Sequence, residues 1–509
     1  MSTTRISVVT PVYNPVLAEL RDCLRSAQGP EVEHILALDG SKNVKNLGAL
    51  RRLVKKFGAS LVICEEQGGI SSASNKAATA AKGEFLVFLD QDDFLVKDWW
   101  APLLEIMGEA DFIYSDAFLA DESGKPFHYW KKPGWSPHRL VFNMYAVHFM
   151  AVRKSVFEKV GGFRSEFDGS QDHDLALRVS RESNRVRHIP TPLYNWRASK
   201  ASTASNPENK KWAFDAGLAT AQEHISFYSK GASLEKIEGY PGALRPRYTS
   251  RTEPVSVVIP TAFSSSSPES FYVDSLLRSL IPFLSAELGD QIVLVHGGEE
   301  HSSFVKQLQS TSKVEILSVK DNDQFNFSQR CNIGFLMAKH GHVLLLNDDI
   351  EFGEENPLDN LFGTLKMPNV GLVGALLVFP DFSIQHGGHA FTDGDPHHAH
   401  YGAKSLSHGL MDLVVDHEVV GVTGALMFQL KSTWEAVGGF STQFPLNYND
   451  VDYCQKVRTL GYSIIQANSV TAVHHESVTR EPIIEDYETN LIRQRWPDVL
   501  RSDEFSTTD

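Results

Sequence analysis

Cysteine is scarce in this chain, with four residues among 509, at Cys23, Cys64, Cys331 and Cys454. Their scattered positions exclude the close pairing that a zinc site or a redox motif requires, so we expect buried free thiols. No stretch approaches the roughly 20 apolar residues that span a bilayer. The first residues, Met-Ser-Thr-Thr-Arg, lack the apolar region of a signal peptide. These absences predict a cytoplasmic protein.

Positive charge is also in short supply. Lys and Arg number 48 against 63 Asp and Glu, and the formal net charge of −15 argues against nucleic acid as a partner. The glycine-rich turns of dinucleotide folds and phosphate loops are missing as well. The first apolar run of each half leads instead into Pro11-Val-Tyr-Asn14 or Pro260-Thr-Ala-Phe263. A nucleotide bound here needs another anchor, and a metal ion is the obvious substitute.

What the chain does contain is one short pattern that occurs twice, roughly 250 to 280 residues apart, which predicts two copies of one domain. Each copy opens on an apolar run closed by proline and continues to a second apolar run that ends in acids. It then reaches Val-Gly-Gly-Phe shortly before an Asp-x-Asp. The paired segments are 6–11 and 255–260, 85–93 and 342–349, 160–163 and 437–440, and 172–174 and 450–452.

The periodicity of both halves predicts an α/β protein. Apolar runs rich in Val, Ile and Leu alternate with helix-length segments, as in a mainly parallel sheet with crossover helices. The expected strands are 6–10, 34–38, 60–64, 85–89, 255–259, 291–295, 314–317 and 342–346, and the expected helices include 16–27, 44–57 and 71–81. We predict domains at 1–205 and 252–509, joined by a partly helical linker at 206–251.

The second apolar run of each half ends in acids. These are Asp90, Asp92 and Asp93 in the first half, and Asp348 and Asp349 after Asn347 in the second. Open α/β sheets bind ligands at the carboxyl ends of their strands, and carboxylates there suit Mg²⁺ or Mn²⁺ bridged to phosphate oxygens. One such cluster is equally well a polar turn, but its recurrence favours function. The metal would neutralise charge on a departing nucleoside diphosphate.

A second pair of acids, Asp172 and Asp450, follows the Gly-Gly-Phe turns and begins amphipathic segments. Acids in the first turn of a helix favour its dipole, so helix capping explains either residue alone. The functional alternative is a general base. Transfer of a sugar to an alcohol requires a deprotonated acceptor hydroxyl, and a positioned Asp can remove that proton.

Together these segments resemble the family 2 inverting glycosyltransferases of the GT-A fold, in the tandem arrangement of bacterial O-antigen, rhamnan and other surface-polysaccharide synthesis proteins. The resemblance covers nearly the whole chain. The matching stretches are 10–14, 38–41, 69–75, 88–93, 114–116, 169–178 and 193–197 in the first half, and 325–332, 346–349, 384–388, 421–425, 449–452 and 474–477 in the second. No single stretch is decisive, but the ordered set is highly specific.

The resemblance implies a role for each matching residue. The first half would bind the donor through Pro11, Tyr13, Asp39, Asn75 and Asp90, hold the metal with Asp92 and use Asp172 as the base. The second half would bind the donor through Pro260, Asn332, Asn347 and Asp348, hold the metal with Asp349 and His474, or less favourably His475, and use Asp450 as the base. The implied partners are UDP- or dTDP-sugar donors and a lipid-linked glycan acceptor, with peripheral membrane contact.

Each half departs from the family pattern at one position. In the second half, the acid expected after the second strand is replaced by His296. In the first, Asn195 stands where family members commonly have histidine, a better metal ligand. Both halves keep an acid cluster and a candidate base, which favours two active sites.

Some aromatic residues and histidines outside these motifs have two readings. His397, His398 and His400 could bind zinc, but a solvated loop is the commoner reading of such a stretch. Trp135 and Trp196 are the tryptophans that we expect to face the acceptor, whereas core packing is expected for most others.

Three functions compete on this sequence. The first is an enzyme with two sugar-transferring domains that builds a surface glycan. In the second, one half is catalytic and the other is a degenerate domain that grips the acceptor. The third, a nucleotidyltransferase that makes an activated sugar, typically needs a glycine-rich first loop with Arg and Lys, which this chain lacks.

Overall fold

In a computed structural model, the chain forms two compact units. The first comprises Met1–Ile225, Lys236–Leu244 and Ser506–Asp509, and the second Ser226–Glu235 and Arg245–Phe505. The structure describes residues 4–41, 46–198, 211–267, 270–298, 301–321, 324–392, 394–404, 411–475, 484–501 and 503–507. Residues 44–45 of an expected helix, 206–210 of the expected linker and 476–477 of the last matching stretch lie outside this set.

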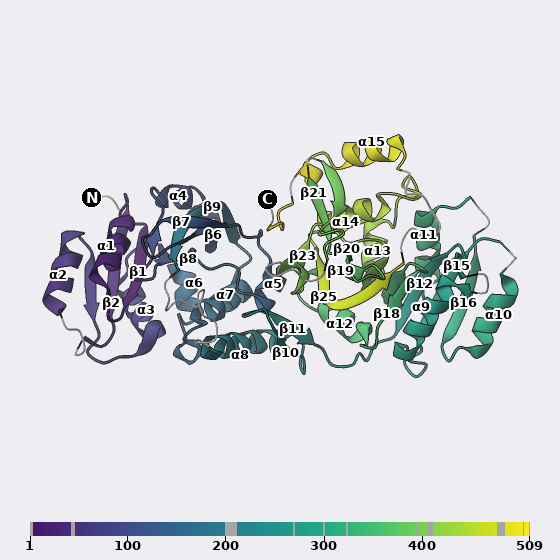
Figure 1. Cartoon of the computed structure of the whole chain (residues 1–509), viewed down its shortest axis with the longest axis horizontal. Coiled ribbons are helices and arrows are strands. Elements are labelled where there is room, and N and C mark those ends of the chain that lie inside the picture. The colour runs from purple at the N-terminus through teal and green to yellow at the C-terminus, as the bar shows by residue number, and fades with distance from the viewer. Residues whose placement is uncertain are drawn as a thin grey trace. The chain divides into compact units, whose positions relative to one another are not determined.

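The first unit is built on one mixed sheet with the order β3-β2-β1-β4-β8-β6-β9-β5, and β7 pairs with β6 (Figure 1). The neighbours β3, β2, β1 and β4 are parallel, as the apolar runs predict. The strands are β1 (Ile6–Val12), β2 (Val32–Leu38), β3 (Ser60–Ile63), β4 (Phe85–Phe88), β5 (Phe94–Leu95), β6 (Phe112–Ala120), β7 (Pro126–Trp130), β8 (Met150–Arg153) and β9 (Val186–Arg197).

The second unit repeats this sheet strand by strand, in the order β16-β15-β12-β17-β24-β19-β25-β18. Here β20 pairs with β19 as β7 pairs with β6, and β23 is added beside β25. The strands are β12 (Val255–Thr261), β15 (Gln291–His296), β16 (Glu315–Lys320), β17 (His342–Leu346), β18 (Ile350–Phe352), β19 (Val370–Val378), β20 (Ile384–His386), β23 (His417–Val419), β24 (Leu426–Leu430) and β25 (Ser463–His474). The predicted α/β class with two related sheets is confirmed.

Helices and short hairpins complete each unit. The first has α1 (Leu17–Ser26), α2 (Leu47–Lys56), α3 (Gly69–Ala80), α4 (Trp100–Ile106), α5 (Pro137–Phe142), α6 (Lys154–Lys159), α7 (Gln171–Glu182) and most of α8 (Lys211–Tyr228). The second has α9 (Tyr272–Leu280), α10 (Ser302–Thr311), α11 (Phe327–Met337), α12 (Pro357–Leu365), α13 (Lys431–Val437), α14 (Asn449–Thr459) and α15 (Asp486–Arg495). The short paired strands are β10 (Ser233–Lys236) with β11 (Leu244–Arg247), β13 (Ser265–Ser267) with β14 (Ser270–Phe271), and β21 (His389–Thr392) with β22 (Asp395–His398).

Local signals explain where several of these helices begin. Asn46 and Asn326 precede α2 and α11, and each side chain accepts a hydrogen bond from a backbone N–H of the first turn. Pro357 stands at the start of α12, where its missing N–H costs nothing. The predicted linker at 206–251 includes α8, whose first part packs within the first unit. Within the described residues, no helix is long and apolar enough to cross a membrane.

The parallel strands carry the two cores. They are buried on both faces, as the successive residues Val8 and Val9 of β1 and Val257 and Val258 of β12 show, because helices cover each side of the sheet. All four cysteines are buried and unpaired, as expected. Burial of the strands leaves their carboxyl ends as the place where polar side chains emerge.

Sheet register fixes which residues of the two units correspond. Val9 pairs with Phe88 in the first sheet, and Val258 pairs with Leu345 in the second. Both of the first-named residues lie two positions before the closing proline. Counting on from these pairs matches Asp90, Gln91 and Asp92 with Asn347, Asp348 and Asp349 respectively.

Candidate active sites

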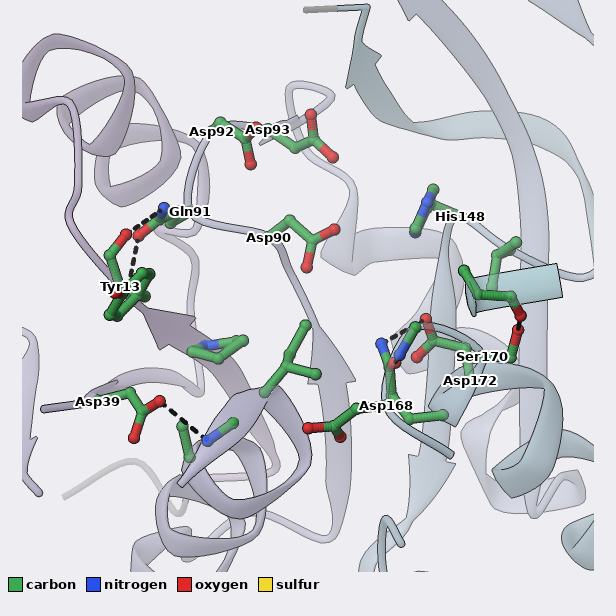
Figure 2. Close-up of a pocket in the computed structure, with 18 of the residues that line it drawn as sticks. Tyr13, Asp39, Asp90, Gln91, Asp92, Asp93, His148, Asp168, Ser170 and Asp172 are labelled. Atoms are coloured by element: carbon green, nitrogen blue, oxygen red, sulfur yellow. Dashed lines mark hydrogen bonds between the residues drawn. The ribbon is translucent and has the colours of Figure 1, made fainter. Parts of the chain in front are cut away.

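A cavity of about 780 Å³ lies at the carboxyl ends of β1 and β4 in the first unit. It gathers most of the residues predicted for the first site, and Figure 2 shows their acids around one space. The predicted residues that line it are Pro11, Tyr13, Asp39, Asp90, Asp92 and Asp172.

Asp39 is fixed at one end of this cavity by the start of α3. Its two carboxylate oxygens accept hydrogen bonds from the backbone N–H groups of Gly68 (2.7 Å) and Gly69 (3.0 Å). Glycine is required at position 69, where φ is +87° and a Cβ would lie 2.2 Å from Asp168. The helix N-terminus favours the negative charge of Asp39 and sets its orientation.

Tyr13 is held by Gln91, which the motif analysis passed over. The backbone N–H of Tyr13 donates to Oε1 of Gln91 (3.0 Å), and Nε2 of Gln91 donates to the Tyr13 carbonyl oxygen (2.9 Å). Tyr13 keeps 43% of its surface exposed, so its ring is available at the cavity rim. This double hydrogen bond joins the β1 loop to the acid cluster.

Asp93, the third acid of the cluster, is an anchor. It is buried and accepts hydrogen bonds from the Tyr194 hydroxyl and the Arg197 backbone N–H, both at 2.7 Å. Burial, and then the charges of Asp90 and Asp92, raise the pKa of Asp93 well above its usual range. Asp93 also lines the cavity, but both of its oxygens accept hydrogen bonds from β9, whereas Asp90 and Asp92 are the other two carboxylates of the cluster beside the cavity (Figure 2).

The two acids of the Asp172-x-Asp174 pair have different surroundings. Asp172 stands in the first turn of α7, lines the cavity, and has its pKa raised to about 6 by burial. Asp174 is fully buried and ion-paired with Arg164 and Arg178, whose hydrogen bonds lower its pKa although burial opposes this. The cavity therefore receives one carboxylate from α7, with a pKa suited to proton transfer near neutral pH.

Asn75 and Asn332, predicted as donor-binding residues, make hydrogen bonds to the Gly-Gly-Phe turns. The amide of Asn75 donates to the Phe163 carbonyl oxygen (2.8 Å) and accepts from the Phe163 N–H (2.9 Å). Asn332 makes the same two bonds with Phe440, both at 2.8 Å. Neither the donor nor the acceptor group of these side chains is directed at a ligand site. Both asparagines thus hold the Gly-Gly-Phe turns, and donor binding by them stays a prediction.

The predicted acids of the second site lie at the ends of β17 and β25. Asp348 accepts a 2.6 Å hydrogen bond from the Thr261 hydroxyl, and burial raises its pKa to about 6. His474 approaches Asp349 (Nε2 to Oδ1, 3.2 Å) and Asn347 (Nε2 to Nδ2, 3.5 Å). Pro260 precedes Thr261 at the end of β12.

The neighbouring histidine, His475, is directed elsewhere. Its Nε2 lies 3.0 Å from the Glu351 carboxylate, and its ring packs against the Tyr272 ring with the two planes tilted. Of the two late histidines, His474 is the one that the structure brings to the acid cluster.

Register identifies the counterpart of His474 in the first unit. Ile350 pairs with His474, and in the first sheet Phe94 pairs with Asn195. Asp349 corresponds to Asp92, so Ile350, one residue later, corresponds to the residue just before Phe94. Because the paired strands are antiparallel, the counterpart of His474 lies one residue after Asn195, at Trp196. The sequence comparison placed the missing histidine at Asn195, which is instead buried with its amide near the Phe94 carbonyl oxygen.

The corner that Asp39 occupies, at the carboxyl end of the second strand, has different residues in the second unit. Leu38 pairs with Val12 and His296 pairs with Thr261, so the counterpart of Asp39 is Gly297. His296 therefore does not replace the acid. It is buried and hydrogen-bonded to Ser318 (2.8 Å), as the counterpart of the apolar Leu38.

Arg330 of α11 occupies this corner in the second unit. A Cβ at Gly297 would lie 2.9 Å from its guanidinium. Arg330 donates to the Thr261 carbonyl oxygen (2.9 Å) and pairs with Asp321 (3.2 Å). The second unit thus presents a buried Arg–Asp pair where the first presents a single carboxylate.

Asp450 lies in the first turn of α14, as Asp172 lies in α7. Its Oδ2 accepts from the Gly424 N–H (3.0 Å) and lies 3.7 Å from Nε2 of His389. Burial opposes ionisation, but the His389 imidazole and the Gly424 N–H together lower the pKa of Asp450 below its usual range. The two candidate bases therefore have opposite pKa shifts.

No group of three or more His, Cys, Asp or Glu side chains has a metal-binding arrangement within the described residues. The second unit offers the better partial donor set, because Asp349 and His474 supply one carboxylate and one imidazole. The Nδ1 atom of His474 is buried without a hydrogen bond, as is Oδ1 of Asp349. These donors fit one side of a Mg²⁺ or Mn²⁺ site whose remaining ligands are phosphate and water.

Tryptophans take different places around the first site. Trp196 lines the cavity, whereas Trp135, the other tryptophan expected to face the acceptor, lies among Phe112 and Tyr145. Trp212 of α8 also lines the cavity with 54% of its surface exposed. Its position was hidden from the sequence because it falls in the predicted linker.

The comparisons with known proteins agree with this geometry. Residues 7–161 match the family model described as glycosyl transferase family 2. That match covers most of β1, the Asp39 corner and the acid cluster of the first unit, and it ends at Gly161, before the rest of the Gly-Gly-Phe turn.

Two relatives align with both units of this chain. The O-antigen biosynthesis protein RfbC of Myxococcus xanthus is 28% identical over 491 residues, covering 93% of this chain and 38% of the relative. The uncharacterized protein y4gI of Sinorhizobium fredii is 29% identical over 499 residues, covering 93% of this chain and 53% of that protein. The chain thus spans about half the length of these relatives, or less. Among solved structures, the match to S. aureus TarS 1–349 covers 44% of this chain and 65% of the TarS chain, with 18% sequence identity and a TM-score of 0.35.

Proposed function

We propose that this protein is a bifunctional, metal-dependent inverting glycosyltransferase. It transfers sugars from nucleoside-diphosphate donors to a growing bacterial surface polysaccharide. One observation carries the proposal: both units have the same strand order, with acids after the equivalent strand and an aspartate at the start of the equivalent helix. In the first unit these acids line one cavity. In the second, Gly424 donates to Asp450, and the next residue, Ala425, accepts from the N–H of Asn347 beside the acid cluster. The family match and the O-antigen name of one relative support a role in polysaccharide synthesis.

In the first site, the nucleotide lies at the ends of β1 and β2. Asp39 is oriented to accept hydrogen bonds from the base, while Tyr13 and Pro11 cover it. Asp90 lies next to the ribose and Asp92 next to the diphosphate. A divalent metal bound at Asp92, or at Asp349 with His474, would neutralise negative charge on the leaving diphosphate.

Asp172 and Asp450 supply the proton acceptors. In an inverting transfer the acceptor hydroxyl attacks the anomeric carbon from the face opposite the leaving group. The carboxylate accepts the hydroxyl proton as the new C–O bond forms and the bond to the diphosphate breaks. Asp172 meets this requirement because it lines the same cavity as Asp92 and is positioned by the first turn of α7.

A second candidate function is favoured by the corner at the end of the second strand in the second unit. Gly297 and the Arg330–Asp321 pair stand where the first unit holds Asp39, so the second unit would be a degenerate domain that grips the acceptor glycan. The acids, His474 and Asp450 remain in place there, and for this reason we prefer two active sites.

Single Asp172→Asn and Asp450→Asn variants decide between these functions. The protein is incubated with Mn²⁺, an acceptor glycan and a panel of UDP-, dTDP- and GDP-sugars, and the linkages are assigned by product analysis. Two active sites require that each variant loses a different linkage. Loss of all products in Asp172→Asn with none lost in Asp450→Asn supports the degenerate second domain. If neither variant loses a linkage, the proposed bases are wrong.

A further inference from the structure

Three histidines converge beside Asp450 in the second unit. His386 ends β20, His389 begins β21 and His398 ends β22, with His389 and His398 directly opposite each other in the hairpin. The ring centroids lie 4.8 Å apart for His386 and His398, 5.2 Å for His386 and His389, and 5.8 Å for His389 and His398. The sequence analysis placed His386 in the stretch 384–388 and His398 in the histidine-rich stretch that ends at 400, and it did not single out His389.

Hydrogen bonds fix the protonation pattern of two of these rings. Nε2 of His386 accepts from the Thr423 backbone N–H (3.1 Å), so Nδ1 of the neutral ring carries the proton. That Nδ1–H donates to Nδ1 of His398 (2.8 Å). Burial lowers the pKa of His386 well below its usual range and that of His398 to about 4, so both rings are neutral at physiological pH. Neither ring can flip without breaking this pair.

His389 completes the group and faces Asp450. Its backbone N–H donates to the Gly421 carbonyl oxygen (2.7 Å), and its Nε2 is directed at Oδ2 of Asp450 (3.7 Å). A Cβ at Gly421 would lie 2.7 Å from Nδ1 of His389, so only glycine leaves room for this ring. The segment from Gly421 to Gly424 thus binds the histidines through one end and Asp450 through the Gly424 N–H.

Two alternative roles fit the contacts less well. A metal site is disfavoured because these rings hydrogen-bond to each other and the described residues contain no metal-binding group of three. His389 as the base itself is disfavoured because its Nδ1 faces the Gly421 backbone and its Nε2 faces Asp450. Nδ1 is buried there without a hydrogen-bond partner.

We infer that His389, braced by His386 and His398, is a positioning residue that orients Asp450 for proton transfer in the second site. The inference rests on the proposed function, in which Asp450 is the base. The N–H of Gly424 donates to Oδ2 of Asp450, and Nε2 of His389 lies 3.7 Å from the same oxygen, so the imidazole limits the positions that this carboxylate can take. A base held in one orientation loses less entropy in the transition state.

The same contact has a consequence for pH dependence. The titratable groups that face Asp450 are His389 and His398 from the β21–β22 hairpin, Cys331 from α11 and Cys454 from α14. Burial raises the pKa of both thiols well above physiological pH, so they stay neutral and only the imidazoles favour the carboxylate. Removal of His389 should therefore raise the pH at which the second linkage fails.

The test compares His389→Leu with His389→Gln in the full chain. Leucine removes the donor, whereas glutamine returns an N–H close to the position of Nε2. For the second linkage we expect His389→Leu to lower kcat by roughly 10- to 100-fold with donor KM unchanged, which is the loss of a transition-state interaction. The acid limb of the pH–rate profile of His389→Leu should move to higher pH. His389→Gln should recover most of the wild-type kcat. His397→Leu, on the exposed side of the same hairpin, is the matched control and should resemble wild type.

Each other outcome overturns the inference. It fails if His389→Leu keeps the wild-type kcat and pH profile, or if both variants lose kcat and thermal stability together, which marks a merely structural residue. Should His389→Leu not fold, His398→Asn loosens the brace instead, and an unchanged kcat then contradicts us. Asp450→Asn distinguishes failure of this inference from failure of the proposed function. If Asp450→Asn loses the second linkage and His389→Leu does not, only this inference is wrong. If Asp450→Asn retains that linkage, the proposed base is wrong as well.

Discussion

Two aspartates at equivalent places in the two units differ in the groups around them. Asp172 has burial as the main influence on its pKa, while Asp450 has an imidazole and a backbone N–H beside one oxygen. Local partners, and not the position at the start of a helix, therefore set the protonation state of each candidate base.

This difference predicts distinct pH profiles for the two linkages. The pKa of Asp172 is raised to about 6, so below that pH the carboxyl is protonated and cannot accept a proton. We expect the first linkage to lose about tenfold in rate per pH unit below this value. The pKa of Asp450 is lowered, so the second linkage should continue to form. Product analysis from pH 4.5 to 8 measures both in one reaction, and parallel acid limbs would contradict the prediction.

Because Asp349 is proposed to hold the metal, we predict a selective effect of its removal. Asp349→Ala should abolish donor binding in the second unit and change the free energy of unfolding by no more than roughly 0.5 kcal/mol. By contrast, Asp93→Ala leaves the Tyr194 hydroxyl and the Arg197 N–H without an acceptor. It should lower the free energy of unfolding by about 1 to 3 kcal/mol. Donor titration and thermal unfolding measure these effects. A large stability loss in Asp349→Ala would favour the polar-turn reading.

The elements that carry these residues were largely predictable from the sequence. The strand 6–10 appears as β1 (Ile6–Val12) and 342–346 as β17 (His342–Leu346), because short apolar runs of this length are typical of buried strands. The acids at 90 and 92 follow from the same reasoning, since the end of such a strand must meet solvent.

Other features were out of reach because they depend on contacts distant in sequence. Asn75 lies 88 residues from Phe163, so its clamp could not be told from a donor contact. The corner at Gly297 needed the strand register, without which the adjacent His296 was the natural choice. The approach of His389 to Asp450 required the fold of two hairpins and a helix.

The clamp between α3 and the Gly-Gly-Phe turn predicts a stability effect. Asn75→Ala leaves the N–H and carbonyl oxygen of Phe163 without partners, and we expect a loss of about 1 to 3 kcal/mol. Lys76→Ala, at the next and exposed position of the same helix, should stay within roughly 0.5 kcal/mol. Denaturant unfolding measures both. A higher donor KM without any loss of stability would support the donor-binding role that the family resemblance implied.

At the scale of the whole molecule, both sites should depend on the same kind of cation. Asp92 in one unit and Asp349 with His474 in the other offer oxygen and imidazole ligands that are completed by the donor's diphosphate. We expect excess EDTA to stop formation of both linkages, and Mn²⁺ or Mg²⁺ to restore them. Nucleotide release provides the measurement, and full turnover in the chelator would refute the metal requirement.

The asparagine clamp and the corner at the end of the second strand compare differently between the two units. Asn75 and Asn332 make the same paired hydrogen bonds in both units, whereas Asp39 and Gly297 share only their place in the sheet. The contacts that hold the turns are therefore common to both units, while the side chains at this corner differ. Exchange of a few side chains there is thus a route to new binding specificity that leaves the contacts of the fold in place.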